Sequence, residues 1–465
     1  MKDLYGQLLA KALFPAFEAA RGRPTVPLLR YLENTSHWSA PELRDLQTGL
    51  LRRLLRHAYR HTTHYRRILD ERGLRPEAFY SPLDLSKLPL LDRPTLRATM
   101  LERTANAPPA AVIRKVTSGS SGQPAEVLYN AESRHWRDAI RLRGYGWGGY
   151  RIGMRALHYW GFVPQAGGTW WKRSKVMADR WFKRDLFLDC TPRGEQALLD
   201  AVDQIRRFKP QVIVAYASGA GALARFINDR DLRDWDTIPV LTGAEGLLPH
   251  DRAEIDRAFG AAFDTYGCRE VMLMASECDA HDGFHTSMEN LIVEVVVREG
   301  GTVRAARPGE TGEVVLTDLH NLACPMIRYV NGDLAVAGED KRCKCGRGLS
   351  RIGQIQGRVT ETMYDGAGNA VGGLVFNILF STIGHVARSF QVHQREDGSV
   401  IFKVVPYNGG ALPCREEELL RAHAERYLPG APFSIQIVDN IPLSPAGKRR
   451  VVVCEYKGAM QHALR

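Results

Sequence analysis

The stretch Val212-Ile-Val-Ala-Tyr216 is short, apolar and rich in β-branched residues, which predicts a strand buried on both faces. A similar run, Pro239-Val-Leu-Thr242, comes next, and the segment from His250 to Phe259 after it has helical character. Strands that alternate with helices in this way form parallel sheets with crossover helices. We therefore expect an α/β core between Val112 and Pro325.

The sequence before this core predicts helices. Apolar residues recur at three- and four-residue spacing between Leu43 and Leu69, and Pro82 ends the pattern. We interpret residues 1–105 as a helical lead-in.

The sequence after the core changes character twice. The segments Leu291–Val297 and Glu313–Thr317 flank a turn-rich stretch and predict antiparallel strands. These strands indicate a β-rich subdomain at about residues 290–357 of a large domain with mixed sheets, residues 1–357. Beyond Gly357-Arg358, strands near Phe390–Gln394 and Val400–Val405 and a helix over Arg415–Tyr427 predict a small, mobile α+β domain, residues 358–465.

Composition restricts the class of protein. The 465 residues carry a formal net charge of +11, which suits polyanionic partners such as nucleotides and coenzyme A, or a solvated basic surface. No nucleic-acid recognition motif is present, so we expect no nucleic-acid partner. The eight cysteines are too few for a disulfide scaffold, and neither a secretory signal nor an apolar run of membrane-spanning length occurs. We expect a cytoplasmic protein without integral membrane association.

A loop rich in hydroxyls and glycines, Thr117-Ser-Gly-Ser-Ser-Gly122, follows the apolar pair Val112-Ile113. Its backbone N–H groups and short side chains are suited to phosphate oxygens. It is not a Walker loop, because Lys115 precedes the glycines and no Gly-Lys-Ser/Thr follows them. A flexible connection is the alternative interpretation.

Further motifs follow this loop in a fixed order. They are Gly243-Ala-Glu245, Tyr266-Gly-Cys-Arg-Glu270, Arg328-Tyr-Val-Asn-Gly-Asp333, Gly357-Arg358 and Pro445-Ala-Gly-Lys448. Together they resemble the adenylate-forming acyl-ligase superfamily, in particular the phenylacetate–CoA ligase-like group and its branch linked to capsular polysaccharide genes. The resemblance covers nearly the whole chain, from His57–Tyr65 to Lys448.

The resemblance implies an enzyme that uses ATP and Mg²⁺ to activate a small carboxylic acid as an acyl adenylate. Lys448 corresponds to the catalytic lysine, which bridges the carboxylate and the α-phosphate, and Glu270 to a Mg²⁺-holding glutamate. Asp333 supplies two acceptor oxygens for the ribose hydroxyls. The implied ATP and AMP site comprises Thr117, Ser118, Gly119, Ser120, Ser121, Gly122, Gly243, Ala244, Glu245, Tyr266, Gly267, Asp333 and Arg358.

The acid pocket is implied only by analogy. Its walls are Tyr216, Ala217, Ser218 and Ala275, whose small members leave room for a ring or an acyl chain. Coenzyme A is the implied acceptor. However, Thr360 stands where the superfamily usually has an acidic residue, so an amine or a carrier-protein thiol stays open as the acceptor. A catalytically inactive nucleotide-binding scaffold is the alternative outside enzymes, and a homodimer is compatible with the sequence.

A set of thiols and imidazoles predicts a metal site. Cys343-Lys-Cys345 is a tight chelating turn, and Cys278 lies upstream with His285 seven residues later. Three thiolates and one imidazole form a closed structural zinc set. His281 is the competing fourth ligand, and the pattern of the resembling group favours His285.

The aromatic and basic stretch from Trp170 to Arg184 predicts an amphipathic helix. We expect this helix to cover the sheet. A membrane-surface helix and a carrier-docking patch are the alternatives.

Overall fold

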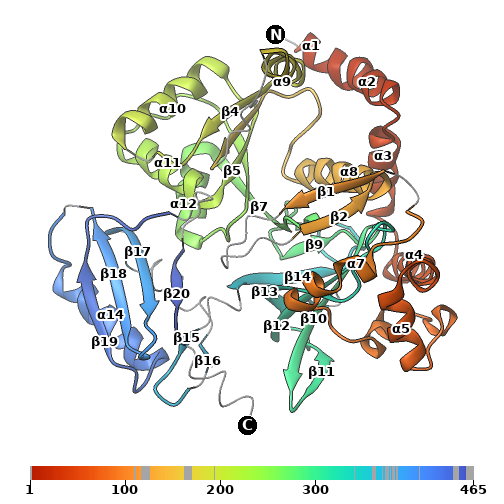
Figure 1. Ribbon diagram of the computed structural model, residues 1–465. Helices are drawn as coiled ribbons and strands as arrows, with labels where there is room; N and C mark the ends of the chain where they lie inside the picture. The colour runs from red at the N-terminus through yellow and green to blue at the C-terminus, as the bar shows by residue number, and fades with distance from the viewer. Residues whose placement is uncertain are drawn as a thin grey trace.

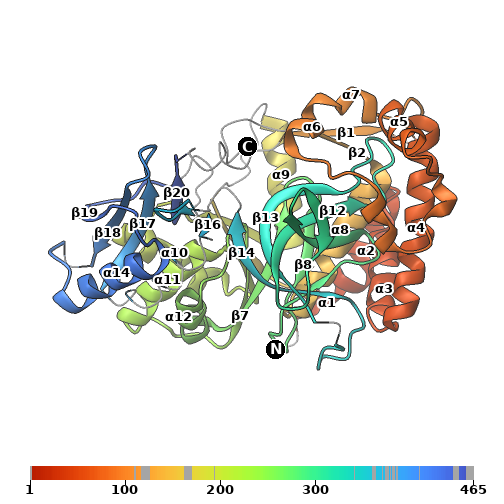
Figure 2. The same cartoon turned by 90° about the horizontal axis from the view of Figure 1, so that it is seen from below.

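One sheet of twelve strands runs through the molecule, in the order β11-β10-β12-β13-β14-β9-β8-β7-β6-β5-β3-β4 (Figure 1). In both views the helices α3–α5 lie at one end of the molecule and the C-terminal strands at the other (Figures 1 and 2). The computed structural model describes residues 3–108, 111–116, 126–161, 170–192, 194–339, 341–358, 363–368, 370–371, 376, 379, 383, 386–407, 409–443 and 450–456.

Five neighbouring strands form a parallel half, as predicted. They are β3 (Ala156–Trp160), β4 (Asp185–Asp189), β5 (Val212–Tyr216), β6 (Ile238–Gly243) and β7 (Gly260–Cys268). The crossover helices are α9 (Trp170–Lys183), α10 (Glu195–Phe208), α11 (Ala217–Asp229) and α12 (Pro249–Phe259). All five residues of β5 are buried, because helices such as α11 cover the sheet with side chains that include Leu223 and Ile227.

The remaining seven strands are antiparallel to their neighbours and continue the same ladder. They are β8 (Met272–Ser276), β9 (Phe284–Thr286), β10 (Leu291–Glu299), β11 (Thr302–Ala305), β12 (Thr311–Asp318), β13 (Tyr329–Ala337) and β14 (Arg351–Arg358). The predicted β-rich segment is therefore hydrogen-bonded to the parallel half through β8 and β9, and does not form a sheet of its own.

The helical lead-in is confirmed. It comprises α1 (Leu4–Leu8), a π-helical turn (Leu9–Leu13), α2 (Phe14–Ala20), α3 (Thr25–Thr35), α4 (Ala40–His61), α5 (Thr63–Glu71), 3₁₀ turns at Pro76–Ala78 and Pro82–Lys87, α6 (Arg93–Ala98) and α7 (Met100–Arg103). Helix α4 begins at a capping box, in which Ser39 and Glu42 satisfy each other's backbone N–H groups. Its apolar face, including Leu51 and Leu55, packs with Ile292 of β10.

The C-terminal part forms a separate four-stranded sheet in the order β19-β18-β17-β20. Its elements are β17 (Ala387–Gln394), β18 (Val400–Pro406), α14 (Cys414–Tyr427), β19 (Phe433–Ile437) and β20 (Val452–Cys454), preceded by the short pair β15 (Met363–Tyr364) and β16 (Ala370–Val371). Both predicted strands and the predicted helix are confirmed. Its position as a mobile domain beyond Gly357 stays a prediction.

Two elements between the lead-in and the sheet frame the site. Strands β1 (Val112–Val116) and β2 (Glu126–Asn130) pair as a hairpin, with Val116 opposite Glu126. Helix α8 (Ala131–Trp147) follows β2 directly.

Helix α8 is attached to the antiparallel half by two buried ion pairs. Arg143 donates to both carboxylate oxygens of Glu289, at 2.6 and 3.1 Å, and these side chains are 1% and 0% exposed. Arg137 donates to Asp318 at 2.7 Å. A carboxylate buried in this way depends on its partner, because desolvation is costly for an unpaired charge.

We predict that Arg143→Met lowers the free energy of unfolding by about 3–5 kcal/mol, because Glu289 stays buried without its cation. Denaturant unfolding followed by tryptophan fluorescence measures the change. Arg206→Met is the matched control; its carboxylate partners Asp203 and Asp234 are exposed, and it should shift stability by less than about 1 kcal/mol. Equal shifts for the two variants would contradict the prediction.

Candidate active site and metal cluster

Three of the sequence-predicted segments lie side by side at the carboxyl ends of parallel strands. Tyr216 ends β5 and is paired with Gly243 at the end of β6, and β7 continues on the other side of β6. The carboxyl edge of a parallel sheet is where open α/β proteins bind their ligands, because loops diverge there. The fold therefore brings Tyr216, Gly243 and Tyr266 to one edge although up to 50 residues separate them along the chain.

The turn after β6 has a constrained backbone. A Cβ at Gly243 would lie 2.9 Å from the Thr265 hydroxyl oxygen, so only glycine fits without a shift. Ala244 has a positive φ of 67°, an unusual conformation for a residue with a side chain. Glu245 accepts a hydrogen bond from the backbone N–H of Ser218 at 3.1 Å, which ties this turn to the start of α11.

Tyr266 and Asp333 meet across the two halves of the sheet. The Tyr266 hydroxyl donates to Asp333 Oδ2 at 2.8 Å, and the Asn331 amide donates to both groups, at 2.9 and 2.8 Å. Burial, and then the Asp333 charge, raises the pKa of Tyr266 well above its ordinary value, so the phenol stays protonated and is a donor. Asp333 also stands opposite Arg358 in the β13–β14 register.

Glu270 is held by two side chains that were not predicted as site residues. Its Oε1 atom accepts from Arg93 at 3.3 Å and from the Tyr329 hydroxyl at 3.2 Å, and the residue is 5% exposed. Arg93 comes from the helical lead-in, 177 residues away. Among the described residues, both contacts reach the same oxygen.

A buried pair of carboxyl groups supports the strand ends. Asp264 accepts from the Thr242 hydroxyl at 2.8 Å, and its backbone N–H donates to Glu277 at 2.8 Å. Arg252 donates to both oxygens of Glu277, each at 2.8 Å. Burial, and then the Glu277 charge, raises the pKa of Asp264 to about 7. These three residues were not predicted, since no local motif marks them.

The residues expected to line the acid pocket are all buried: Tyr216, Ala217, Ser218 and Ala275. The Tyr216 ring packs edge-on against Trp160, with ring centroids 4.4 Å apart. Ala275 is paired with Tyr266 between β8 and β7. Trp160 therefore lies beside Tyr216, a contact that the sequence did not reveal.

Several predicted residues lie outside the described part of the chain. They are Thr117, Ser118, Gly119, Ser120, Ser121, Gly122 and Lys448. For Arg358 only the backbone is described. Gly267 is described and lies in the β7–β8 hairpin, where the backbones approach closely: a Cβ at this position would lie 2.4 Å from the Met272 carbonyl oxygen.

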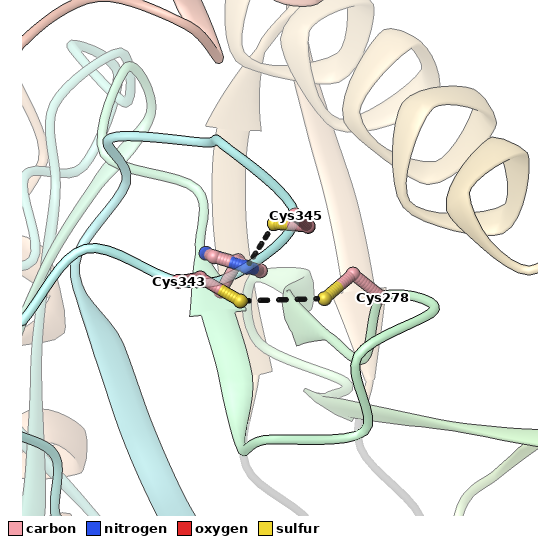
Figure 3. A group of neighbouring side chains, drawn as sticks. Cys278, Cys343 and Cys345 are labelled. Atoms are coloured by element: carbon pink, nitrogen blue, oxygen red, sulfur yellow. Dashed lines mark hydrogen bonds between the residues drawn. The ribbon is translucent and has the colours of Figure 1, made fainter.

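The predicted metal ligands form a cluster (Figure 3). The ligand atoms of Cys278, His285, Cys343 and Cys345 all lie within 4.8 Å of one another. The Cys278 and Cys343 sulfurs are 3.8 Å apart, and Cys345 Sγ lies 3.3 Å from His285 Nε2. The other ring nitrogen, His285 Nδ1, lies 3.3 Å from the Leu349 carbonyl oxygen. That carbonyl needs a donor, so Nδ1 carries the proton and Nε2 presents a lone pair to the sulfurs.

His281 lies outside this cluster. Its Nδ1 is 3.4 Å from Glu277 and its side chain is 42% exposed. The structure therefore groups His285, and not His281, with the three cysteines.

Curated proteins named phenylacetate–coenzyme A ligase are similar to this chain. The protein of that name from Escherichia coli is 30% identical over 322 residues, which cover 64% of this chain and 67% of the relative. The chain belongs to the phenylacetate–CoA ligase family. The protein of that name from Thermus thermophilus is 27% identical over 366 residues, 77% of this chain and 80% of the relative. Protein CapK of Staphylococcus aureus is 20% identical over 90% of each chain, in agreement with the capsular branch.

Solved structures agree with the fold. A 2-hydroxyisobutyryl-CoA ligase in the postadenylation state superposes with a TM-score of 0.71 at 18% identity, over 93% of this chain and 94% of that one. The chain matches none of the protein-family models with which it was compared. As a member of this family it is an adenylate-forming acid–thiol ligase.

Among the described residues, none of the helices has the length and apolarity needed to span a bilayer.

We predict that the pH dependence of stability differs between the wild type and Asp264→Asn. The folded-state pKa of Asp264, about 7, exceeds its unfolded value, so its contribution is fully present at low pH and is lost as pH rises toward and through 7. The wild type should lose stability relative to the variant between about pH 4 and 7, by at most about 1.4 kcal/mol per pH unit, and the difference should level off above pH 7. Thermal unfolding over this range measures the difference. The control is Asp200→Asn, at an exposed aspartate, whose stability should follow the same pH dependence as the wild type. The same pH dependence for Asp264→Asn would contradict the prediction.

Proposed function

We propose that this enzyme activates a small aryl or acyl carboxylic acid with ATP and transfers the acyl group to coenzyme A. The observation that carries the proposal is the meeting of Tyr266, Asp333 and the Gly243–Glu245 turn at one sheet edge, in a chain of this family. A carboxylate oxygen attacks the α-phosphorus and pyrophosphate leaves. The thiol sulfur then attacks the acyl carbon, its proton is lost and AMP leaves.

Each residue of the site has a role in this proposal. Asp333 accepts the ribose hydroxyls, and the Tyr266 and Asn331 donors fix the orientation of its carboxylate. The turn from Gly243 to Glu245 and residues Tyr266 and Gly267 pack along the adenine, while Arg358, opposite Asp333, lies near the ribose. The loop from Thr117 to Gly122, which joins the paired ends of β1 and β2, contacts the leaving pyrophosphate.

Lys448 is proposed to neutralise the anions that meet in this step, and Mg²⁺, when bound, would supply further positive charge. Glu270 is the proposed metal-holding carboxylate. Its Oε1 is bound by Arg93 and Tyr329, so Oε2 is the atom offered to the cation. Mg²⁺ usually keeps several waters and binds one or two carboxylates together with phosphates, and one carboxylate oxygen at this position suits that mode.

The acid is proposed to lie against Tyr216, Trp160 and the small residues Ala217, Ser218 and Ala275. In this proposal the two aromatic rings form an apolar wall, and the small side chains leave space for the acyl group. We further propose that residues 358–465 rotate as a small domain on residues 1–357, about the backbone at Gly357, whose φ is 101°. A cytoplasmic location and a homodimer stay proposals.

We predict acid-dependent ATP–pyrophosphate exchange over a panel of aryl, fatty and hydroxy acids. Lys448→Ala should reduce the exchange rate by at least about 100-fold, because the charge that develops at the α-phosphate loses its cation. ATP binding, measured by calorimetry, should change far less. Lys341→Ala, an exposed lysine paired with Glu339, is the control and should exchange at the wild-type rate. No exchange with any acid would favour a nucleotide-binding scaffold.

The acceptor is tested with the acid that supports exchange. Coenzyme A, amines and a carrier protein are added separately, and the products are identified by mass spectrometry. An acyl-CoA product supports the proposal. If the product is an amide or an acylated carrier protein, and coenzyme A gives no product, the adenylation step of the proposal stands. The acceptor in the second half-reaction is then an amine or a carrier protein, and not coenzyme A.

We also propose that Cys278, His285, Cys343 and Cys345 hold a structural zinc ion. Sulfurs bound to zinc at about 2.3 Å in a tetrahedron lie about 3.8 Å apart, the separation found for Cys278 and Cys343. Four protein ligands leave no open coordination position, so the metal would stabilise the fold and take no part in the reaction. The set joins the loop after β8, strand β9 and the loop before β14.

We predict one zinc per chain in the purified protein, measured by mass spectrometry of the metal. Cys343→Ser should lose most of the zinc and unfold at a lower temperature, because a tetrahedral ligand is removed. Cys414→Ser, at an exposed cysteine outside the cluster, should keep both zinc and stability. A fully folded wild type without metal would refute this site.

A further inference from the structure

Helix α9 exposes a stripe of large apolar side chains. Trp170, Trp171, Met177 and Trp181 are between 66% and 76% exposed. Trp170, Met177 and Trp181 are spaced by seven and four residues, which places them on one face of the helix. The expectation that this stretch covers the sheet is therefore wrong for its tryptophans. The helix forms as predicted, but its tryptophans face away from the protein.

Basic residues border the stripe. Five of the fourteen residues of α9 are Lys or Arg, and Asp179 is the single acid. From the helical period, Arg173 and Arg180 lie together beside the stripe. Arg180 is 4.5 Å from the centroid of the Phe187 ring, so its guanidinium is held close to the helix surface.

The opposite face of α9 is anchored to the N-terminal helices. Phe182 packs on Phe17 with ring centroids 5.1 Å apart, the Tyr5 hydroxyl donates to the Phe182 carbonyl, and Arg184 pairs with Asp3 at 2.7 Å. Helix α1 lies beside α9 at the rim of the molecule (Figure 1). It adds Leu4 and Leu8, one turn apart and 73% and 51% exposed. We call Leu4, Leu8, Trp170, Trp171, Met177 and Trp181 the α9 patch.

We propose that the α9 patch docks the enzyme on an anionic membrane surface, with α9 lying in the plane of the interface. Tryptophan prefers the boundary between headgroups and acyl chains, and bordering Lys and Arg side chains reach lipid phosphates. The stripe from Trp170 to Trp181 covers twelve residues and extends about 16 Å along the helix axis, which suits a planar interface. An exposed apolar patch with a basic border is otherwise costly for a water-soluble surface.

Charge complementarity selects anionic lipid over neutral lipid. Helix α9, which carries most of the patch, has five Lys or Arg residues and one acid, on a chain whose formal net charge is +11. Attraction to anionic headgroups adds to the burial of the tryptophans, and it weakens at high salt. Binding through this patch is peripheral and independent of the proposed acid and acceptor.

The test uses the full-length protein and sedimentation with vesicles of phosphatidylcholine, alone or mixed with phosphatidylserine. The wild type should bind the mixed vesicles more strongly, with a blue shift of tryptophan emission and weaker binding at high salt. The double variant Trp170→Ser/Trp181→Ser should lose at least about tenfold in partition coefficient, because two interfacial anchors are removed. Arg173→Glu, at the basic border of the stripe, should weaken binding to mixed vesicles only.

The matched control is Leu83→Ser/Leu101→Ser, which removes two side chains that are 78% and 84% exposed outside the patch. It should bind like the wild type, and circular dichroism should show all variants folded. No binding of the wild type to mixed vesicles, or equal binding by the tryptophan variant, would overturn the proposal. Self-association or carrier-protein binding that depends on Trp170 and Trp181, without vesicle binding, would overturn it in favour of a protein interface.

Discussion

Strand β7 is the constraint on which the site depends, because it pairs in parallel with β6 and antiparallel with β8. It is the strand at which the α/β half becomes the antiparallel half. Asp264 and Tyr266 are two residues apart on it and so share one face. Asp264 holds the Thr242 end of β6, whereas Tyr266 reaches Asp333 of β13. One strand therefore fixes the distance between the parts proposed to bind adenine and ribose.

Two buried carboxyl groups near β7, those of Asp264 and Glu277, have different hydrogen-bond partners. Arg252 donates to both oxygens of Glu277, and Asp264 lies beside them without a cation of its own in the described contacts. Two buried carboxylates next to one guanidinium carry a surplus negative charge, so the group without the cation takes up a proton more readily. Burial is the main cause of the raised pKa of Asp264, and the Glu277 charge adds to it. Asp333, by contrast, accepts hydrogen bonds from two neutral donors, the Tyr266 hydroxyl and the Asn331 amide.

The sequence was informative where the structure is local. Periodicity was sufficient for β5, α12 and the helices of the lead-in, because burial on one or two faces imposes a repeat on neighbouring residues. It was not sufficient for Arg93 and Glu270, whose contact joins positions 177 residues apart and leaves no pattern in either segment. Helix α9 was predicted from its composition. Periodicity identifies the apolar face of such a helix, but it does not show whether the protein or solvent covers that face. The choice between His281 and His285 stayed open for a similar reason, since only the short strand β9 directs His285 to the cysteines.

The position of the Cys/His cluster coincides with the weakest part of the ladder. Strand β9 has three residues and pairs with β8 and β14 through two residue pairs on each side, whereas β10 and β12 share six. Within the sheet, strands β10 to β14, including β13 with Asp333, are joined to β8 and β7 through this short strand. Short strands contribute few hydrogen bonds and little packing, so register there needs support from outside the ladder. Cys278 precedes β9, His285 lies within it and Cys343 and Cys345 follow it, so a cation bound by all four would supply that support. Such a cation would keep Asp333 in register with Tyr266 while remaining outside the proposed nucleotide site.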